Sequence, residues 1–102
     1  LNDDQYGFEI QQVDTSFFPV ALTVDHAGTA KRTNIPDVEA DHRHYYGAIL
    51  TVGEKVDFYV DGVKKVTHTQ NLPSDHGYSI LIRLPNDGGT LYNYLLNYAE
   101  DI

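Results

Sequence analysis

The chain has 102 residues, of which 41% are hydrophobic and 22% are charged, an ordinary balance for one globular domain. Fifteen acidic residues against seven basic ones give a formal net charge of −8, so nucleic acid and anionic membranes are poor partners, because both need clustered Lys and Arg. Cysteine is absent, which excludes disulfides and thiolate chemistry, and no apolar run approaches the ~20 residues that span a bilayer.

A chain of this length can bury one hydrophobic core without disulfide or metal staples. It contains no Met, and no signal peptide is visible in its acidic first residues, LNDDQ. We therefore expect residues 1–102 to be a single domain excised from a larger protein, with any export signal outside this sequence.

Alternation of apolar and polar residues predicts two strands at the start of the chain, YGFEIQQV (residues 6–13) and FFPVALTV (residues 17–24). The apolar positions that share a face are Tyr6, Phe8 and Ile10 in the first strand and Val20, Leu22 and Val24 in the second. Pro19 cannot donate a backbone hydrogen bond, so it indicates a strand start or an edge strand.

Residues 25–41 are polar, contain Gly28 and Pro36 and keep no steady period, which predicts a long loop with room for one short strand. Alternation resumes in HYYGAILTV (residues 44–52). One face of this predicted strand carries Tyr46, Ala48, Leu50 and Val52, and the other carries Tyr45, Ile49 and Thr51. Gly53-Glu54 predicts the turn that follows.

The segment VDFYVDGVKKVTH (residues 56–68) predicts a β-hairpin. Val56, Phe58 and Val60 share one face of its first strand. Asp61-Gly62 fits a two-residue type I′ turn, because both central residues of that turn need a positive φ, which Asp tolerates and Gly adopts without strain.

Two further strands are predicted after the turn formers of NLPSDHG. YSILIRL (residues 78–84) is apolar on both sides and is expected to be a central strand. TLYNYLLNY (residues 90–98) alternates aromatic residues with Asn, which favours a strand over a short helix. Seven or so short strands with almost no helix predict an all-β, antiparallel β-sandwich.

The stretch from His44 to Pro73 resembles part of the concanavalin A-like lectin/glucanase superfamily, which includes laminin-G-like modules and laminarinase-type glycoside hydrolases. The features that carry the resemblance are His44 and Tyr46 on one strand, YVDG at residues 59–62, the basic doublet Lys64-Lys65 and Pro73. The resemblance covers about a third of the chain and implies a jelly roll of two antiparallel sheets. Such domains usually exceed this length, so we expect a trimmed or partial version.

The laminarinase-type members carry Glu, Asp and Glu at alternate positions of one strand, which places three carboxylates on one face. The nearest match here puts Glu9 first, Gln11 in place of the Asp and Val13 in place of the second Glu, while Asp14 is one residue out of register. A retaining glycosidase needs two carboxyl groups about 5–5.5 Å apart. We therefore expect no catalytic residue, and Glu9 is interpreted as a solvated carboxylate on an exposed strand face.

Two groups of residues suggest metal ligands, although no metal site is expected. His42 and His44 lie two apart, the spacing that points both side chains the same way on a strand and could begin a zinc or nickel site. Calcium is the more plausible ion, on Asp37, Glu39 and Asp41 or on Asn86-Asp87. Neither group follows a known calcium-loop pattern, so solvated loops are the preferred interpretation and no cofactor is assigned.

Sugar-binding sites need flat aromatic faces and fixed polar groups. The chain offers eight Tyr and no Trp. The predicted ligand-binding residues are Tyr45, Tyr78, Tyr92, Tyr94, Asn93, His42, His76 and Arg83. Tyr59 is interpreted as structural, and Asp61 and Gly62 as turn chemistry.

These observations favour a non-catalytic, lectin-like module that binds glycan, such as a cell-wall or other polysaccharide. We expect it on a bacterial or phage surface or in a secreted protein, at the cell surface, outside the cell or on a virion. One alternative is a structural or assembly domain that contacts a protein partner or forms oligomers. The other is a fragment of a laminarinase-type glycoside hydrolase.

Overall fold

The computed structural model describes residues 4–74, 80–83 and 94–101, and this part of the chain is all-β with no helix. No described segment is therefore a helix long and apolar enough to cross a membrane. The strands are β1 (Gln5–Val13), β2 (Ser16–Val24), β3 (Ala30–Asn34), β4 (His44–Thr51), β5 (Lys55–Val60), β6 (Val63–His68), β7 (Ile80–Arg83) and β8 (Tyr94–Asp101). The single short strand allowed for in residues 25–41 is β3, which confirms that prediction.

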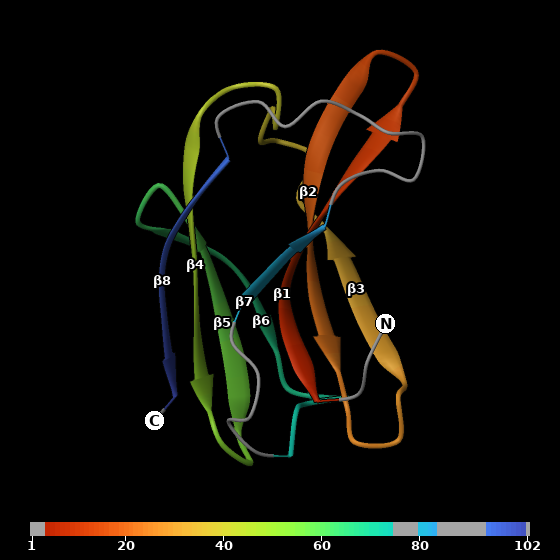
Figure 1. Ribbon diagram of the computed structural model, residues 1–102, viewed down its shortest axis with the longest axis vertical. Coiled ribbons are helices and arrows are strands. Elements are labelled where there is room, and N and C mark those ends of the chain that lie inside the picture. The colour runs from red at the N-terminus through yellow and green to blue at the C-terminus, as the bar shows by residue number, and fades with distance from the viewer. Residues whose placement is uncertain (1–3, 75–79, 84–93, 102) are drawn as a thin grey trace.

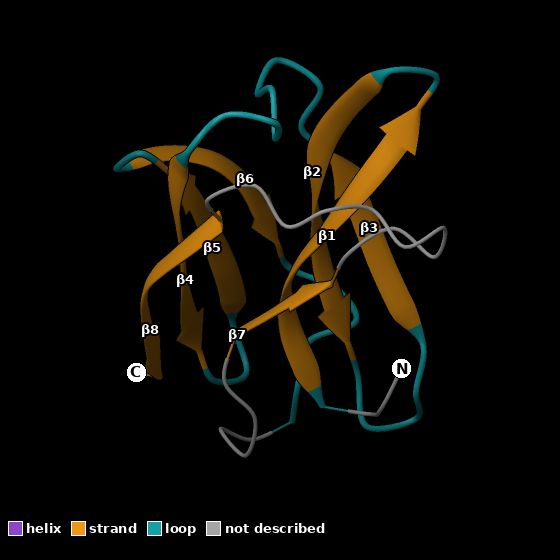
Figure 2. Ribbon diagram, turned by 45° about the horizontal axis from the view of Figure 1, so that its top comes forward, coloured by secondary structure: helices purple, strands orange, loops and turns teal. Residues whose placement is uncertain are grey.

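The strands form two sheets, with the orders β3-β2-β1-β7 and β6-β5-β4-β8. In each sheet, three consecutive strands make an antiparallel meander (Figure 1). The fourth strand of each sheet comes from the C-terminal part of the chain and runs parallel to its neighbour, β7 beside β1 and β8 beside β4 (Figure 2). The expectation of wholly antiparallel sheets was therefore wrong for these two pairings.

The expectation that residues 78–84 form a central strand was also wrong, because β7 ends the described order of its sheet. Strong apolar character does not choose between a central and an edge position, since pairing depends on distant strands. The expectation of a strand rather than a helix in residues 90–98 is confirmed for the described residues Tyr94–Asp101.

The two sheets pack face to face through aromatic side chains. The Phe8 ring centroid lies 5.1 Å from that of Tyr46 and 5.4 Å from that of Phe58, at inclined angles that aromatic pairs prefer. Around them lie further buried residues on the faces that alternation predicted: Tyr6, Ile10, Ala48, Leu50, Val56 and Val60. The core therefore joins both meanders.

The opposite face of β1 and β2 is buried as well. Val20, Leu22 and Val24 are at most 1% exposed, and the strand register sets Val20 beside Glu9. Pro19 is buried inside β2, which lies between β1 and β3, so the expectation of a strand start or an edge strand was wrong. The Pro19 carbonyl accepts the Ile35 N–H, just beyond the end of β3. The nitrogen of Pro19, which has no hydrogen to donate, therefore faces the side of β2 on which the pairing with β3 has ended.

The predicted hairpin turn is confirmed. Val60 pairs with Val63, and Asp61 and Gly62 have φ values of 53° and 78°, as a type I′ turn requires. Gly53, with φ 77°, and Glu54 turn the chain between β4 and β5, also as predicted.

Candidate functional site

A shallow depression of about 410 Å³ lies where the loop of residues 35–43 meets the start of β4 and the β5–β6 turn. It is open to solvent, and six of its nine lining residues have polar or charged side chains. The lining residues are Asp37, Val38, Glu39, His42, His44, Val60, Asp61, Val63 and Lys65. The set contains three carboxylates, two histidines and a lysine, so it offers both hydrogen-bond acceptors and donors to a ligand.

The loop presents its polar residues because its apolar ones are buried. Ile35, Val38 and Ala40 point into the core, while Asp37 and Glu39 between them are exposed. Backbone bonds hold the loop against β2, from the Ile35 N–H to Pro19 and from the Ala40 N–H to Phe17. This alternation fixes one side of the depression.

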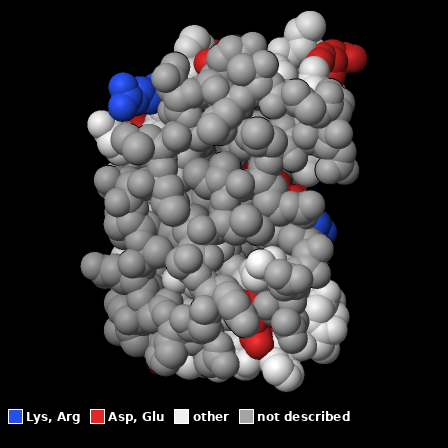
Figure 3. All heavy atoms as spheres, in the orientation of Figure 1, with Lys and Arg blue, Asp and Glu red and all other residues white. Residues whose placement is uncertain are grey.

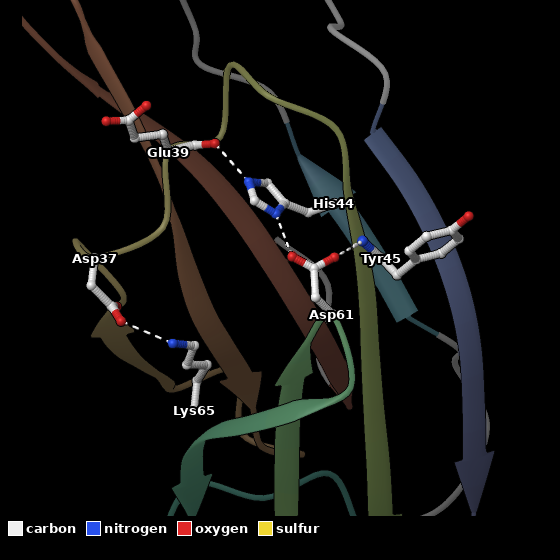
Figure 4. A network of polar contacts seen from close by, with 6 residues as sticks. All are labelled: Asp37, Glu39, His44, Tyr45, Asp61 and Lys65. Carbon is white, nitrogen blue, oxygen red and sulfur yellow. Dashed lines mark hydrogen bonds and ion pairs between the residues drawn. The ribbon is translucent and has the colours of Figure 1, made fainter.

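Asp61, in the β5–β6 turn, forms the other side of the depression. Its Oδ1 accepts the Tyr45 N–H at 2.9 Å, and its Oδ2 lies 2.6 Å from His44 Nδ1 (Figure 4). The Asp61 N–H in turn donates to the Tyr45 carbonyl at 2.8 Å. Partial burial raises the pKa of Asp61, but the bonds from Tyr45 and His44 outweigh it and the net pKa is lowered. The turn residue predicted from the sequence thus also fastens the hairpin to β4.

His44 links the loop of residues 35–43 to the β5–β6 turn. Its Nε2 lies 2.8 Å from the Glu39 carbonyl and its Nδ1 faces Asp61, so both ring nitrogens meet acceptors. Both ring nitrogens thus have partners within the protein, and the Asp–His pair resembles only part of a catalytic triad.

The loop also carries a group of potential metal ligands, Glu39, Asp41 and His42, whose donor atoms all lie within 4.8 Å of one another. His42 Nε2 is 3.0 Å from Glu39 Oε2 and 3.7 Å from Asp41. The predicted pairing of His42 with His44 is absent from this group, because both nitrogens of His44 are engaged elsewhere. All three groups are exposed, and nothing further in the described residues points to an ion.

The third predicted calcium ligand of the loop is also engaged. Asp37 Oδ2 accepts a bond from Lys65 Nζ at 2.9 Å, and this bond lowers the pKa of Asp37. Asn86-Asp87 lies outside the described residues.

Two of the predicted ligand-binding residues have described side chains. His42 lines the depression, and Tyr45 is 47% exposed beside it, with its ring directed away from Asp61 in Figure 4. For Tyr94 and Arg83 the structure describes the strand backbone only. The others lie outside the described residues: Tyr78, Tyr92, Asn93 and His76. Sequence reasoning did not assign Asp61, Lys65 or Val63 to a site.

Glu9 is not the solvated carboxylate that the sequence suggested. It is 6% exposed, and Arg32 from β3 donates to both of its oxygens, from Nε to Oε1 at 2.7 Å and from Nη2 to Oε2 at 3.2 Å. Gln11 Nε2 lies 3.3 Å from Glu9 Oε1, which confirms that residues 9 and 11 share a face. The carboxylate is thus committed to an ion pair.

A second polar cluster surrounds Asp4 at the opposite end of the strands. Asp4 Oδ2 lies 2.7 Å from His26 Nδ1, and Asp4 Oδ1 accepts bonds from the N–H and hydroxyl of Ser74. The bond to His26 is the main reason that the pKa of Asp4 is lowered. Ser74 and His26 both bind Asp4. Ser74 therefore bonds to the Asp4 carboxylate and not to the His26 imidazole, whereas a nucleophilic serine needs a bond to an imidazole.

The described charges do not form a continuous patch on the face seen in Figure 3. Acidic atoms are scattered along it, and the basic atoms lie at its margins.

Comparison with models of protein families, with curated proteins and with solved structures finds no match for this chain.

Proposed function

We propose that the chain is a non-catalytic, lectin-like carbohydrate-binding module on a jelly-roll sandwich of the concanavalin A-like kind, carried by a surface or secreted protein of a bacterium or phage. The observation that carries the proposal is the open depression between residues 35–43 and the β5–β6 turn, with its fixed acceptors and donors. The two face-to-face sheets support the fold part of the proposal.

The depression suits a hydroxyl-rich ligand. Asp61 is held by two bonds before any ligand arrives, so it can accept a hydroxyl hydrogen bond with little loss of side-chain entropy. Lys65 and His42 supply donors, and Val63, 56% exposed, supplies an apolar surface for a sugar ring. A mixture of fixed polar groups and apolar surface is what small-ligand sites commonly present.

The same geometry argues against the hydrolase alternative. The one carboxylate that the sequence aligned with a catalytic position, Glu9, is bound by Arg32. One of the two histidines of the depression, His44, has both nitrogens engaged. Reversible ligand binding therefore fits these side chains better than bond cleavage.

The test is an NMR titration of the labelled protein with soluble cell-wall and plant polysaccharide fragments. We expect amide shifts in residues 37–44 and 60–65 with at least one fragment. His42→Ala combined with Lys65→Ala should weaken that binding about 10-fold, the scale of one lost charge-assisted hydrogen bond. Glu54→Ala, an exposed change in the β4–β5 turn, is the matched control and should bind normally.

Three outcomes would count against the proposal. The first is the absence of shifts across the panel, and the second is binding that the double variant leaves unchanged. The third is a protein that elutes as an oligomer whose interface covers the depression, which would favour the assembly alternative. Tyr45→Ala adds one discrimination, because weaker binding in this variant would extend the site onto the neighbouring sheet face.

A further inference from the structure

His68, the last residue of β6, links the two sheets through the core. His68 is 0% exposed, and its ring packs against that of Phe58 at an interplanar angle of 64°, with centroids 5.1 Å apart. Its Nδ1 lies 3.0 Å from the Thr23 hydroxyl on β2, and its Nε2 lies 2.8 Å from the Thr33 hydroxyl on β3. One ring from the second sheet thus bonds two strands of the first.

The neutral ring satisfies this geometry completely. A neutral imidazole has one N–H donor and one acceptor nitrogen, and a threonine hydroxyl can either donate or accept. One hydroxyl therefore accepts from the ring while the other donates to it. Protonation would turn both nitrogens into donors and force one hydroxyl to reverse inside the core.

No described carboxylate faces the ring to stabilise a positive charge. Lys31 on β3 lies on the same face as Thr33 and opposes protonation by its own charge. Apart from Lys31, charged groups of the packed strands pair with one another on the outer faces, where Glu9 binds Arg32 and Asp57 contacts Lys55 and Lys64. Burial, followed by the charge of Lys31, lowers the pKa of His68 to about 4.

We propose that His68 is an acid-sensitive link between the two sheets, and that its protonation separates the β3 edge of one sheet from the β6 edge of the other. Both strands end their sheets on this side, so the opening needs no other strand to leave its place. The consequence is a molecule that loosens on one side in mild acid while the β1, β4 and β5 core remains paired.

The pH range follows from the direction of the shift. Because the folded protein binds the proton less readily than the unfolded chain, the stabilising effect of neutral His68 is complete above pH 6.5 and is lost as pH falls toward 4. Between pH 7 and pH 5, this loss shifts the equilibrium roughly 20-fold toward the unfolded state. The shift reaches roughly 300-fold when protonation is complete. The aspartates with lowered pKa, among them Asp4 and Asp25, act below their ordinary value of 3.8.

The experiment follows the histidine ring signals and the backbone amide exchange of the wild-type protein between pH 7.5 and 4.5. We expect the His68 ring signals to stay those of a neutral ring to below pH 5. Amide exchange, corrected for its intrinsic pH dependence, should rise in β3 and β6 before it rises in β4 and β5. A His68 ring that titrates near pH 6.5, or exchange that rises evenly in all strands, would overturn the proposal.

Urea unfolding of variants gives the second readout. His68→Gln keeps hydrogen-bonding groups but cannot titrate, so its unfolding midpoint should lose the wild-type fall between pH 7 and 5. His42→Gln, at an exposed histidine, is the matched control and should keep it. If His68→Gln fails to fold, the ring titration of the wild type decides alone.

Discussion

At the scale of single residues, alternation predicted the strand face on which a side chain lies, but it did not predict which residue that side chain contacts. Alternation set Glu9 and Gln11 on one face, and the contact between them confirms it. The environment of Glu9 was missed because its partner, Arg32, lies 23 residues away on another strand. The same holds for Asp61. Its role in the turn depends on neighbouring residues and was predicted, whereas its bond to Tyr45 depends on the register of the sheet and was not.

The Glu9–Arg32 pair predicts a loss of stability. Glu9→Gln keeps the shape but removes the charge and one of two acceptor oxygens. We expect the free energy of unfolding in urea at pH 7 to fall by about 1–2 kcal/mol, because a bond to a charged group is worth that much when one partner is buried and the other half-exposed. Glu54→Gln, at an exposed turn position, should change it little. Equal stability of Glu9→Gln and wild type would show that the pair contributes nothing.

At the scale of elements, the only two basic doublets of the chain fall on the strands that end the sheets. Lys31-Arg32 lies in β3 and Lys64-Lys65 in β6. An end strand presents unpaired backbone groups that another chain can bind, and charged side chains oppose that approach. The doublets thus act against association along these edges.

This role predicts self-association when the charge is removed. Lys64→Val with Lys65→Val leaves four consecutive valines on an exposed end strand. We expect the mass measured by light scattering after size exclusion to rise with protein concentration above that of the wild type. Lys55→Val is the matched control, because it removes a lysine of similar exposure from β5, which has neighbours on both sides. A double variant that keeps the wild-type mass would contradict the edge role.

At the scale of the whole molecule, both sheets depend on one aromatic contact. Phe8 meets Tyr46 and Phe58 across the interface, so Phe8→Ala leaves a cavity that touches both sheets. We expect a loss of about 3–5 kcal/mol in the free energy of unfolding, in one transition seen alike by circular dichroism and by tyrosine fluorescence. Phe17→Ala, which removes a ring only partly buried against the core, should cost clearly less. Two separate transitions would show that the sheets unfold independently.

The sequence therefore predicted the local features of the fold and few of its long-range ones. Period-2 alternation and the Asp61-Gly62 turn were enough for strands and hairpins, because both depend on neighbouring residues. The parallel pairing of β7 and β8, and the site between residues 35–43 and Asp61, depend on segments that meet only after folding. Of the candidate site, His42 and Tyr45 were foreseen as contacts, and Asp61 only as a turn.

The parallel fourth strands have a consequence for the order in which the protein is made. Each meander can close from hairpins as it leaves the ribosome, since β1 to β3 and β4 to β6 are consecutive. The β1–β7 and β4–β8 pairings must wait for about 50 to 75 further residues, and contacts between such distant segments form late. Until then the outer sides of β1 and β4 are unpaired, so a nascent chain that stalls after β6 exposes the two strands best suited to capture a neighbour.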